Sequence, residues 1–335
     1  MNLCGSTKKG CCYNFAHISK NKSKMKKINL FIVTILCCYS SIMFGQQDAQ
    51  YTQYMYNTIN INPAYAGSRG TISVFGLHRT QWAGLEGAPI TNTLSVNSPI
   101  NHNMGIGLSV INDKIGPMTE NNVSVDLSYS IDTSPFYKLS FGLKGTANLL
   151  DVDFTKLNIY DPSDPRFQNN VDNKFSPNIG VGVYFHSDRS YIGLSIPNML
   201  ENSHYDKSAK NESQSFVVKE RMHYYLMAGY VFDLDYNLKF KPSVLTKAVQ
   251  GAPLQTDISA NFLFNEKFTA GLAYRWSASI SALAGFQVSD SWFIGYSYDA
   301  ETTKLANYNS GSHEIFLRFE VLGGSKSRMM SPRFF

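Results

Sequence analysis

The chain has 335 residues, 43% of them hydrophobic, and carries 30 Lys and Arg against 25 Asp and Glu. The basic excess comes from one end, because seven Lys and no acidic residue precede Gln46, which leaves 23 basic and 25 acidic residues after that point. A slightly acidic remainder lacks the basic surface that nucleic-acid binding needs, so we expect no nucleic-acid partner.

The first 45 residues have the plan of an export leader. A basic Lys26-Lys27 pair precedes an apolar run over 30–44, as in secretory signal peptides, and Gly45 offers a small residue for cleavage. The apolar run is too short for a good spanning helix. A complete basic region begins at Met25, which we therefore expect to be the true start, and whether the residues before it are translated stays open.

The next stretch, 46–70, is dense in Tyr, Gln and Asn and carries few charges. Apolar residues at four-residue spacing from Tyr51 to Ile59 predict a short helix that Asp48 caps, because a carboxylate accepts the unpaired N–H groups of a first turn. The Asn62-Pro63 pair should end this helix, since the residue before Pro avoids the helical conformation. The pattern alone is compatible with an arm tucked against the fold, with a plug or with a docking peptide.

Beyond Gly70 the chain alternates between apolar residues and small or polar ones, in segments of about ten residues. A tilted strand of this length crosses a bilayer core, and no run of 18 apolar residues predicts a spanning helix. A soluble sandwich also alternates, but charges at strand centres favour a barrel with a polar inner face. These charges are Asp126, Lys144, Asp257, Arg275 and Arg318.

Aromatic residues near strand ends also favour a membrane barrel, where they form girdles at the two interfaces. They are Tyr129, Phe136, Tyr137, Tyr184, Phe185, Trp276, Trp292, Tyr296 and Tyr298.

We therefore predict an all-β, outer-membrane β-barrel of about 14 antiparallel strands, the even number of a bacterial single-chain barrel. The predicted strands are 71–80, 89–98, 103–112, 120–131, 137–150, 176–187, 190–197, 221–232, 238–247, 254–264, 267–275, 279–289, 292–299 and 313–322. The long links 151–175, 198–220 and 300–312 follow odd-numbered strands, and tight links follow even-numbered ones. This parity predicts periplasmic ends for the barrel.

On this prediction the chain has four parts: a leader with a signal peptide, an N-terminal periplasmic or plug segment, the barrel, and a tail with terminal aromatic residues. They span 1–45, 46–70, 71–322 and 323–335.

Three motifs carry a family resemblance. They are Gln50–Gly67 with its Asn62-Pro63-Ala64-Tyr65-Ala66-Gly67 ending, the Arg79-Thr80-Gln81-Trp82 run with Gly87-Ala88-Pro89, and Ser331-Pro332-Arg333-Phe334-Phe335. This pattern resembles the PorP/SprF family, outer-membrane proteins of the type IX secretion and gliding-motility machinery of Bacteroidota. The resemblance covers the chain after Gln46; it is specific at the first motif and only barrel-like through the middle.

The resemblance implies an outer-membrane component that assists export or surface attachment of a specific cargo, a secreted adhesin with a C-terminal sorting domain. It also implies type IX components as partners, with a periplasmic peptidoglycan-binding protein as one candidate, besides outer-membrane lipid. The family supplies no catalytic residues. The sequence leaves open the cargo, the periplasmic partner, the oligomeric state and whether the lumen is open or plugged.

We assign partner binding to residues of the first two motifs, because Tyr buries area yet keeps a hydrogen-bonding group for a partner. They are Tyr51, Tyr54, Met55, Asn57, Asn62, Pro63, Tyr65, Gly67, Arg79 and Trp82. Pro63 and Gly67 should turn the arm back under the first strand, and Arg79 and Trp82 should mark the opposite, outer end.

A transporter of small hydrophobic molecules is the alternative function. The Asn62-Pro63-Ala64 motif is also similar to the hatch of FadL-type barrels, which have 14 strands and a short N-terminal plug. Fold alone does not choose between the two functions. FadL-like proteins have a larger plug and longer loops than this chain, which favours secretion.

Residues for catalysis or metal binding form no motif after the leader. All five Cys lie in the leader, and the six later His lack the H-x-x-x-H spacing that places two ligands on one face. No G-x-S-x-G motif occurs. The acidic loop 151–174 lacks the EF-hand spacing, and a solvated loop is the simpler interpretation. We expect no enzyme, no cofactor and no metal.

Overall fold

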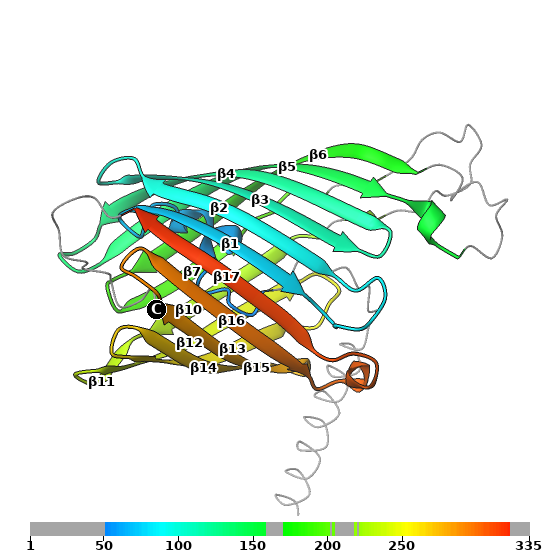
Figure 1. The fold of residues 1–335 in the computed structure, drawn as a ribbon. Helices are drawn as coiled ribbons and strands as arrows, with labels where there is room; N and C mark the ends of the chain where they lie inside the picture. The colour runs from blue at the N-terminus through cyan, green and yellow to red at the C-terminus, as the bar shows by residue number, and fades with distance from the viewer. Residues whose placement is uncertain (1–50, 159–169, 202, 205–217, 220, 322–335) are drawn as a thin grey trace, which may run out of the picture. The chain divides into compact units, whose positions relative to one another are not determined.

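The structure, a computed structural model, describes residues 51–158, 170–201, 203–204, 218–219 and 221–321. Fourteen of the described strands form one closed antiparallel barrel (Figure 1). Strands that follow each other in sequence pair in the sheet, β1 pairs with β17, and β10 pairs with β12, so the ring has no free edge. The predicted 14-stranded barrel is confirmed.

The wall strands are β1 (Ile72–Thr80), β2 (Ile90–Pro99), β3 (Met104–Ile115), β4 (Met118–Asp132), β5 (Lys138–Val152), β6 (Val171–His186), β7 (Ser190–Ile196), β10 (His223–Tyr230), β12 (Leu238–Val249), β13 (Gln255–Phe264), β14 (Phe268–Arg275), β15 (Ser279–Gln287), β16 (Trp292–Glu301) and β17 (Ser312–Val321). Among the remaining strands, β11 (Phe232–Asp235) continues β10 along β12, and β8 (Ser203–His204) pairs with β9 (Val218–Lys219) apart from the barrel.

Burial alternates along the strands as the sequence predicts. In β4 the side chains of Val125 and Leu127 are exposed, while Ser124, Asp126 and Ser128, which alternate with them, are buried. A closed barrel that turns its apolar residues outward and its charges inward satisfies all wall hydrogen bonds internally, as a lipid environment requires. None of the described helices is long and apolar enough to cross a membrane.

The two ends of the barrel carry different connections. The first, fifth, seventh and thirteenth wall strands, which are β1, β5, β7 and β16, end in the links 81–89, 153–170, 197–222 and 302–311, at what we call the long-loop end. Wall strands at even places in this count end in links of two to five residues, such as 187–189 after β6 and 236–237 after β10 and its continuation β11, at what we call the short-turn end. Since outer-membrane barrels have long extracellular loops and short periplasmic turns, we expect the short-turn end to face the periplasm.

Two details of the predicted barrel are wrong. The hairpin of β5 and β6 extends to Val152 and from Val171, so it takes up parts of the link predicted over 151–175. Tyr184, predicted to lie in an aromatic girdle, points into the lumen at 2% exposure, because its place in the alternation of β6 is an inward one. Its neighbour Phe185 faces outward and stacks on Tyr137 with ring centroids 5.1 Å apart.

Candidate functional site inside the barrel

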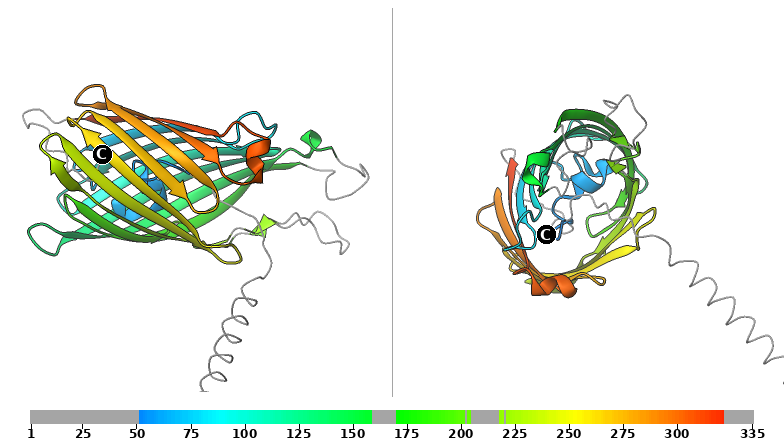
Figure 2. Two further views of the ribbon diagram at one scale, coloured as in Figure 1. Left: turned by 90° about the horizontal axis from the view of Figure 1, so that it is seen from below. Right: turned by 90° about the vertical axis from the view of Figure 1, so that its right-hand side faces the viewer.

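The described chain begins inside the barrel. Residues 51–70, which we call the arm, run through the lumen, and all of 51–66 are buried (Figure 2, right view). The arm contains α2 (Thr58–Ile61) and the short 3-10 helix η1 (Pro63–Tyr65).

The helix predicted from Tyr51 onward is wrong over its first part, and its expected cap, Asp48, lies outside the described residues. The wall replaces that cap: the Glu314 carboxylate accepts the backbone N–H groups of Thr52 and Gln53 at 3.0 and 2.9 Å. The predicted stop at Asn62 is confirmed, because α2 ends one residue before it and Asn62 is extended.

The start of the arm is held by charged residues of the wall. Arg79 donates to Asp299 at 2.7 Å and to Glu314 at 2.9 Å, and all three side chains are at most 2% exposed. The Thr52 hydroxyl donates to Asp299 at 2.6 Å and accepts from Arg79 at 3.0 Å. Charge-assisted bonds of this kind are about twice as strong as neutral ones, so this network fixes where the arm begins.

A second ion pair lies beside this network. Arg275 donates three hydrogen bonds of 3.0 Å to the Asp257 carboxylate and one of 3.2 Å to the backbone carbonyl of Tyr51. The Tyr51 hydroxyl is 3.2 Å from the hydroxyl of Thr93 on β2. The carbonyl and the hydroxyl of Tyr51 therefore both bind side chains of the wall.

The middle of the arm lies against glycines. A Cβ added to Gly142 would be 2.1 Å from the backbone nitrogen of Ala64, and one added to Gly182 would be 2.1 Å from the Asn62 amide oxygen. A Cβ on Gly105 would be 2.2 Å from the carbonyl oxygen of Ala66. Real Cβ atoms do not approach so closely, so these wall glycines make room for the arm.

Hydrogen bonds complete this contact. The Asn62 amide donates to the carbonyl of Val183 at 3.0 Å and accepts from the N–H of Ala64 at 3.0 Å. Ser195 donates to the carbonyl of Ile61 at 2.8 Å, and Ser128 donates to that of Ala66 at 2.7 Å. The wall therefore holds the Asn-Pro-Ala turn both by close packing and by hydrogen bonds. Tyr65 packs edge-on against Tyr184, with ring centroids 5.8 Å apart.

The arm leaves the lumen at the short-turn end. Gly67 has φ 70° and lies so close to Gly105 that an added Cβ would be 2.8 Å from its Cα. Arg69 then pairs with Glu320 at 2.5 Å and donates to the Tyr65 hydroxyl at 3.2 Å. The arm therefore has an anchor at each end and a close fit between them.

The residues assigned from the sequence to partner binding come together, with one exception. Those from Tyr51 to Gly67 all belong to the arm, and Arg79 binds its start. Arg79 lies next to the last residue of β1, at the long-loop end of that strand, and there it contacts Thr52 at the start of the arm. Trp82 lies beyond, in the link after β1, where its backbone N–H donates to the Ser312 hydroxyl at 3.1 Å.

Two sets of site residues were not predicted. Asp299 and Glu314 hold the arm from β16 and β17, and the wall glycines make room for it from β3, β5 and β6. In the sequence they are marked only by the alternation of inward and outward positions, because each occupies an inward position of its strand.

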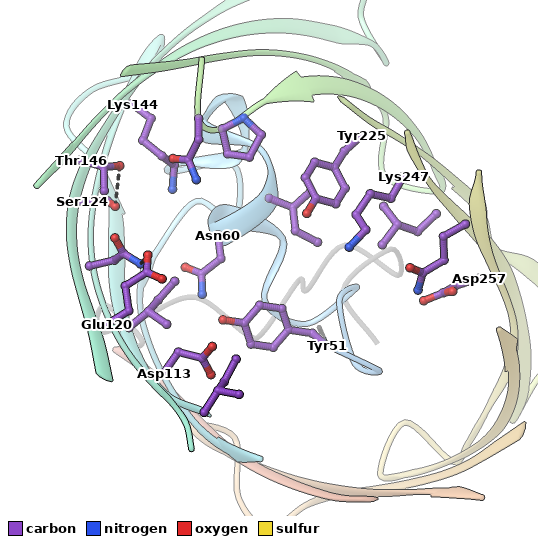
Figure 3. A pocket seen from close by; sticks show the side chains of 18 of the residues that line it. Tyr51, Asn60, Asp113, Glu120, Ser124, Lys144, Thr146, Tyr225, Lys247 and Asp257 are labelled. Atoms are coloured by element: carbon purple, nitrogen blue, oxygen red, sulfur yellow. Dashed lines mark hydrogen bonds between the residues drawn. The ribbon is translucent and has the colours of Figure 1, made fainter. Parts of the chain in front are cut away.

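A chamber lies beside the arm residues Tyr51, Asn60 and Ile61 at the long-loop end (Figure 3). Asp113 and Glu120 line one wall, Lys247 and Asp257 line the facing wall, and Tyr51 lies between them. We call it the outer chamber. Its lining combines charges of both signs with apolar side chains such as Ile111, Met118 and Leu245.

A second cavity lies at the short-turn end. Residues 66–70 of the arm line it together with the links 100–103, 134–137 and 187–188. The two cavities share no lining residue, and arm residues contribute to both. Among the described residues no group of three or more His, Cys, Asp and Glu could hold a metal ion.

The family described as type IX secretion system membrane protein PorP/SprF matches residues 43–319 of the chain. Comparison with curated proteins gave no match.

Several solved structures have a similar fold. The chain is 8% identical to outer membrane protein Omp33 of Acinetobacter baumannii, covering 75% of this chain and 98% of that one with a TM-score of 0.45. A FadL homologue of Pseudomonas aeruginosa is 12% identical, with 75% and 89% covered and a TM-score of 0.39. The CymD monoaromatic hydrocarbon channel is 11% identical, with 84% and 96% covered and a TM-score of 0.46. Likenesses this distant say nothing about what this chain binds.

Proposed function

From the premise that this chain belongs to the PorP/SprF family of type IX secretion membrane proteins, we propose that it attaches one secreted adhesin at the cell surface. In this proposal the barrel is an adaptor: cargo is received at the long-loop end, and periplasmic partners bind at the short-turn end. The arm between the two ends gives the adaptor its fixed core.

The occupied lumen is the observation that carries this proposal. The arm is anchored at Thr52 by Arg79 and Glu314 and at Arg69 by Glu320, and its middle fits against wall glycines. A segment bound in three places suits a scaffold better than an open conduit. Buried charge pairs of this kind also favour one register of the arm over others.

The two cavities fit the two kinds of partner. The outer chamber offers charged and amide groups to a polar peptide segment of the cargo, which lies outside the cell. The short-turn-end cavity offers the arm residues 66–70 and neighbouring turns to a periplasmic protein, for which a peptidoglycan-binding protein is our candidate.

A FadL-like transporter of small hydrophobic molecules fits the lumen less well. Asp113, Glu120, Lys247 and Asp257 line the outer chamber, and sites for hydrophobic ligands are lined mainly by apolar side chains. Apolar side chains such as Ile111, Met118 and Leu245 line the chamber as well, so it is the charges and the arm inside the lumen that weigh against this alternative.

The test removes two aromatic anchors of the arm. Combining Tyr51→Ala with Tyr54→Ala takes away two buried rings, at 8% and 1% exposure, without touching a wall strand. We expect the barrel to insert and the cargo adhesin to disappear from the cell surface. Barrel folding is measured as faster migration of the unboiled protein on a gel, and display is measured by surface labelling of the adhesin.

The matched control replaces two tyrosines outside the lumen. Tyr236 and Tyr308 are 93% and 71% exposed, in links at opposite ends of the barrel. Tyr236→Ala with Tyr308→Ala should leave display unchanged. Normal display by the Tyr51 and Tyr54 double variant would mean that the arm only packs, and that the cargo is received elsewhere.

A further inference from the structure

The barrel is closed by the pairing of its first and last strands, β1 and β17, which lie side by side (Figure 1). We call this pairing the seam. The other neighbouring wall strands follow each other along the chain, so that a link joins the two strands of each pair. The length of a link limits how far one strand can slide along the other, which helps to fix their register. No link joins β1 to β17, so the register of the seam has to be fixed in another way.

The alternation of inward and outward residues fixes this register only in part. Sliding by one residue would turn the apolar outward residues of β17 toward the lumen, but sliding by two residues, about 7 Å, keeps every side chain on its face. In the observed register Arg79 lies opposite Glu314 and Leu77 lies opposite Phe316. A slide of two residues in one direction would place Arg79 opposite Phe316 instead. Contacts with the inward residues of β17 therefore decide between registers that alternation leaves equal.

The arm contacts the first part of β17 through the carboxylate of Glu314. This carboxylate accepts the backbone N–H groups of Thr52 and Gln53 at 3.0 and 2.9 Å, and it also accepts from Arg79 of β1 at 2.9 Å. The Thr52 hydroxyl accepts from Arg79 at 3.0 Å. The start of the arm is therefore bonded to both strands of the seam.

Two further contacts of the arm follow along β17. The ring of Tyr56 lies 4.8 Å from the ring of Phe316, between centroids, and Arg69 pairs with Glu320 at 2.5 Å. Glu314, Phe316 and Glu320 all point inward and are at most 2% exposed. Glu314 and Glu320 lie six residues apart, which is about 20 Å along a strand. The arm thus follows β17 over more than half of its length.

The arm and β1 act on β17 as one continuous segment. β1 begins at Ile72, directly after the arm, and the Thr71 hydroxyl between them donates to the carbonyl of Val321 at the end of β17. β1 pairs with the edge of β17, while the arm contacts its lumen face. A slide of β17 by two residues would move Glu314 and Glu320 by about 7 Å and break their bonds with the arm.

We propose that the arm is an internal template for closing the barrel: it binds β17 from the lumen and sets the register in which β17 pairs with β1. The partner of the arm is thus the last strand of its own chain. Buried polar and ionic groups specify register in some other folds, coiled coils among them. This role concerns assembly, so it does not depend on the adaptor function or on the cargo.

Pairs of Cys across the seam report its register. Leu317 faces outward opposite Gly76, where an added Cβ meets no described atom within 4 Å, and the chain after the leader has no Cys of its own. Gly76→Cys with Leu317→Cys therefore forms a disulfide in the observed register. Leu317→Cys with Val74→Cys or with His78→Cys forms one only after a slide of two residues, because diagonal neighbours lie about 7–8 Å apart, beyond the reach of a disulfide.

The template is removed by Thr52→Pro combined with Arg69→Met. Proline lacks both the N–H and the hydroxyl that Thr52 gives to the seam, and neither change touches a wall strand. Disulfides are measured in the outer-membrane fraction of cells, as a change in the mobility of the unreduced chain on a gel. Each hydrogen bond to a charged group shifts an equilibrium by about tenfold or more, so we expect the ratio of observed-register to slid-register disulfide to fall by at least that factor.

The matched control weakens the arm on the opposite side of the lumen. Asn62→Ala removes the bond of the Asn62 amide to the carbonyl of Val183 on β6 and leaves the contacts with β17 in place. This variant should keep the disulfide ratio of the unchanged chain. If the double variant does not reach the outer membrane at all, adding Gly76→Cys with Leu317→Cys to it replaces the template by a covalent bond and should restore the barrel.

Three results would overturn the proposal. The first is an unchanged disulfide ratio in the Thr52 and Arg69 double variant. The second is an equal fall of the ratio in the Asn62→Ala variant, which would mean that the arm acts by general packing. The third is a double variant that does not assemble and is not restored by the Cys pair at Gly76 and Leu317.

Discussion

The arm meets two different surfaces of the same barrel. On the side of β1, β14, β16 and β17 the wall presents charged side chains, among them Arg79, Arg275 and Glu314. On the side of β3, β5 and β6 it presents bare backbone at Gly105, Gly142 and Gly182, so that the arm lies directly on the strands.

The comparison separates two tasks. Charged groups form hydrogen bonds of defined length and direction, and they fix the position of Thr52 and Gln53 along the wall. The wall glycines leave space that a side chain would fill, and this space determines how closely the Asn-Pro-Ala turn packs against the strands. Loss of a charge should therefore release the start of the arm, whereas added volume should lift its middle.

The largest effect is expected on the charged side. Arg79→Leu leaves the carboxylates of Asp299 and Glu314 buried without the guanidinium between them, and breaking a buried charge network costs about 3–5 kcal/mol. We expect this loss in the free energy of unfolding, measured by urea titration in detergent. The control is Arg189→Leu, which breaks a 2.6 Å pair with Asp233 at the surface and should cost about 0–1 kcal/mol.

The position of the arm can be read separately from stability. The chain has no Cys after the leader, so Thr58→Cys places a single, buried thiol on the arm. Maleimide labelling of the folded barrel should be faster in the Arg79→Leu variant than in the Arg189→Leu variant. Equal rates would mean that the network stabilises the wall and does not hold the arm.

The next effect tests the glycine side. Gly142→Ala puts a Cβ 2.1 Å from the backbone nitrogen of Ala64, and overpacking of this kind costs about 1–3 kcal/mol. Gly145→Ala on the same strand faces outward, where an added Cβ has no neighbour within 4 Å among the described residues. The Thr58→Cys thiol should label faster in the Gly142 variant alone. Labelling that rises in both variants would point to a loosened strand β5 instead of a lifted arm.

The sequence predicted the wall well for a physical reason. Successive residues of a strand point to opposite faces of the sheet, so the type of each residue predicts its face without any knowledge of the rest of the fold. Val125 and Leu127 face outward and Asp126 faces inward in this way. Strand ends were less certain, because β5 and β6 run on as a hairpin to Val152 and from Val171, beyond the predicted segments.

The sequence identified the arm as a special segment but did not predict its conformation. Its motif predicted a special segment and the stop at Asn62, both from local chemistry. The predicted helix from Tyr51 was too long, because Glu314, more than 250 residues later, accepts the N–H groups that a helix would otherwise leave unpaired. No local pattern distinguishes Gly142, which the arm contacts, from Gly145, which faces outward, except the parity of the strand.

The smallest effect is expected from the loss of one hydroxyl group, either one that binds the arm or one that binds only the wall. Ser128 donates to the carbonyl of Ala66 at 2.7 Å, whereas Ser124, two inward positions earlier on β4, bonds to Thr146 of the neighbouring strand at 2.9 Å. Each Ser→Ala change removes one hydrogen bond, worth about 0.5–1.5 kcal/mol. Unfolding should therefore become easier by a similar amount in the two variants.

Labelling of the Thr58→Cys thiol should nevertheless differ between them. Ser128→Ala frees the arm close to its exit and should raise the labelling rate modestly, while Ser124→Ala should leave it unchanged. Because both serines lie on the same face of the same strand, strand-wide loosening would affect both variants equally. A faster rate in the Ser124 variant would show that the arm moves with β4 as one unit, and that its contacts with the wall do not act separately.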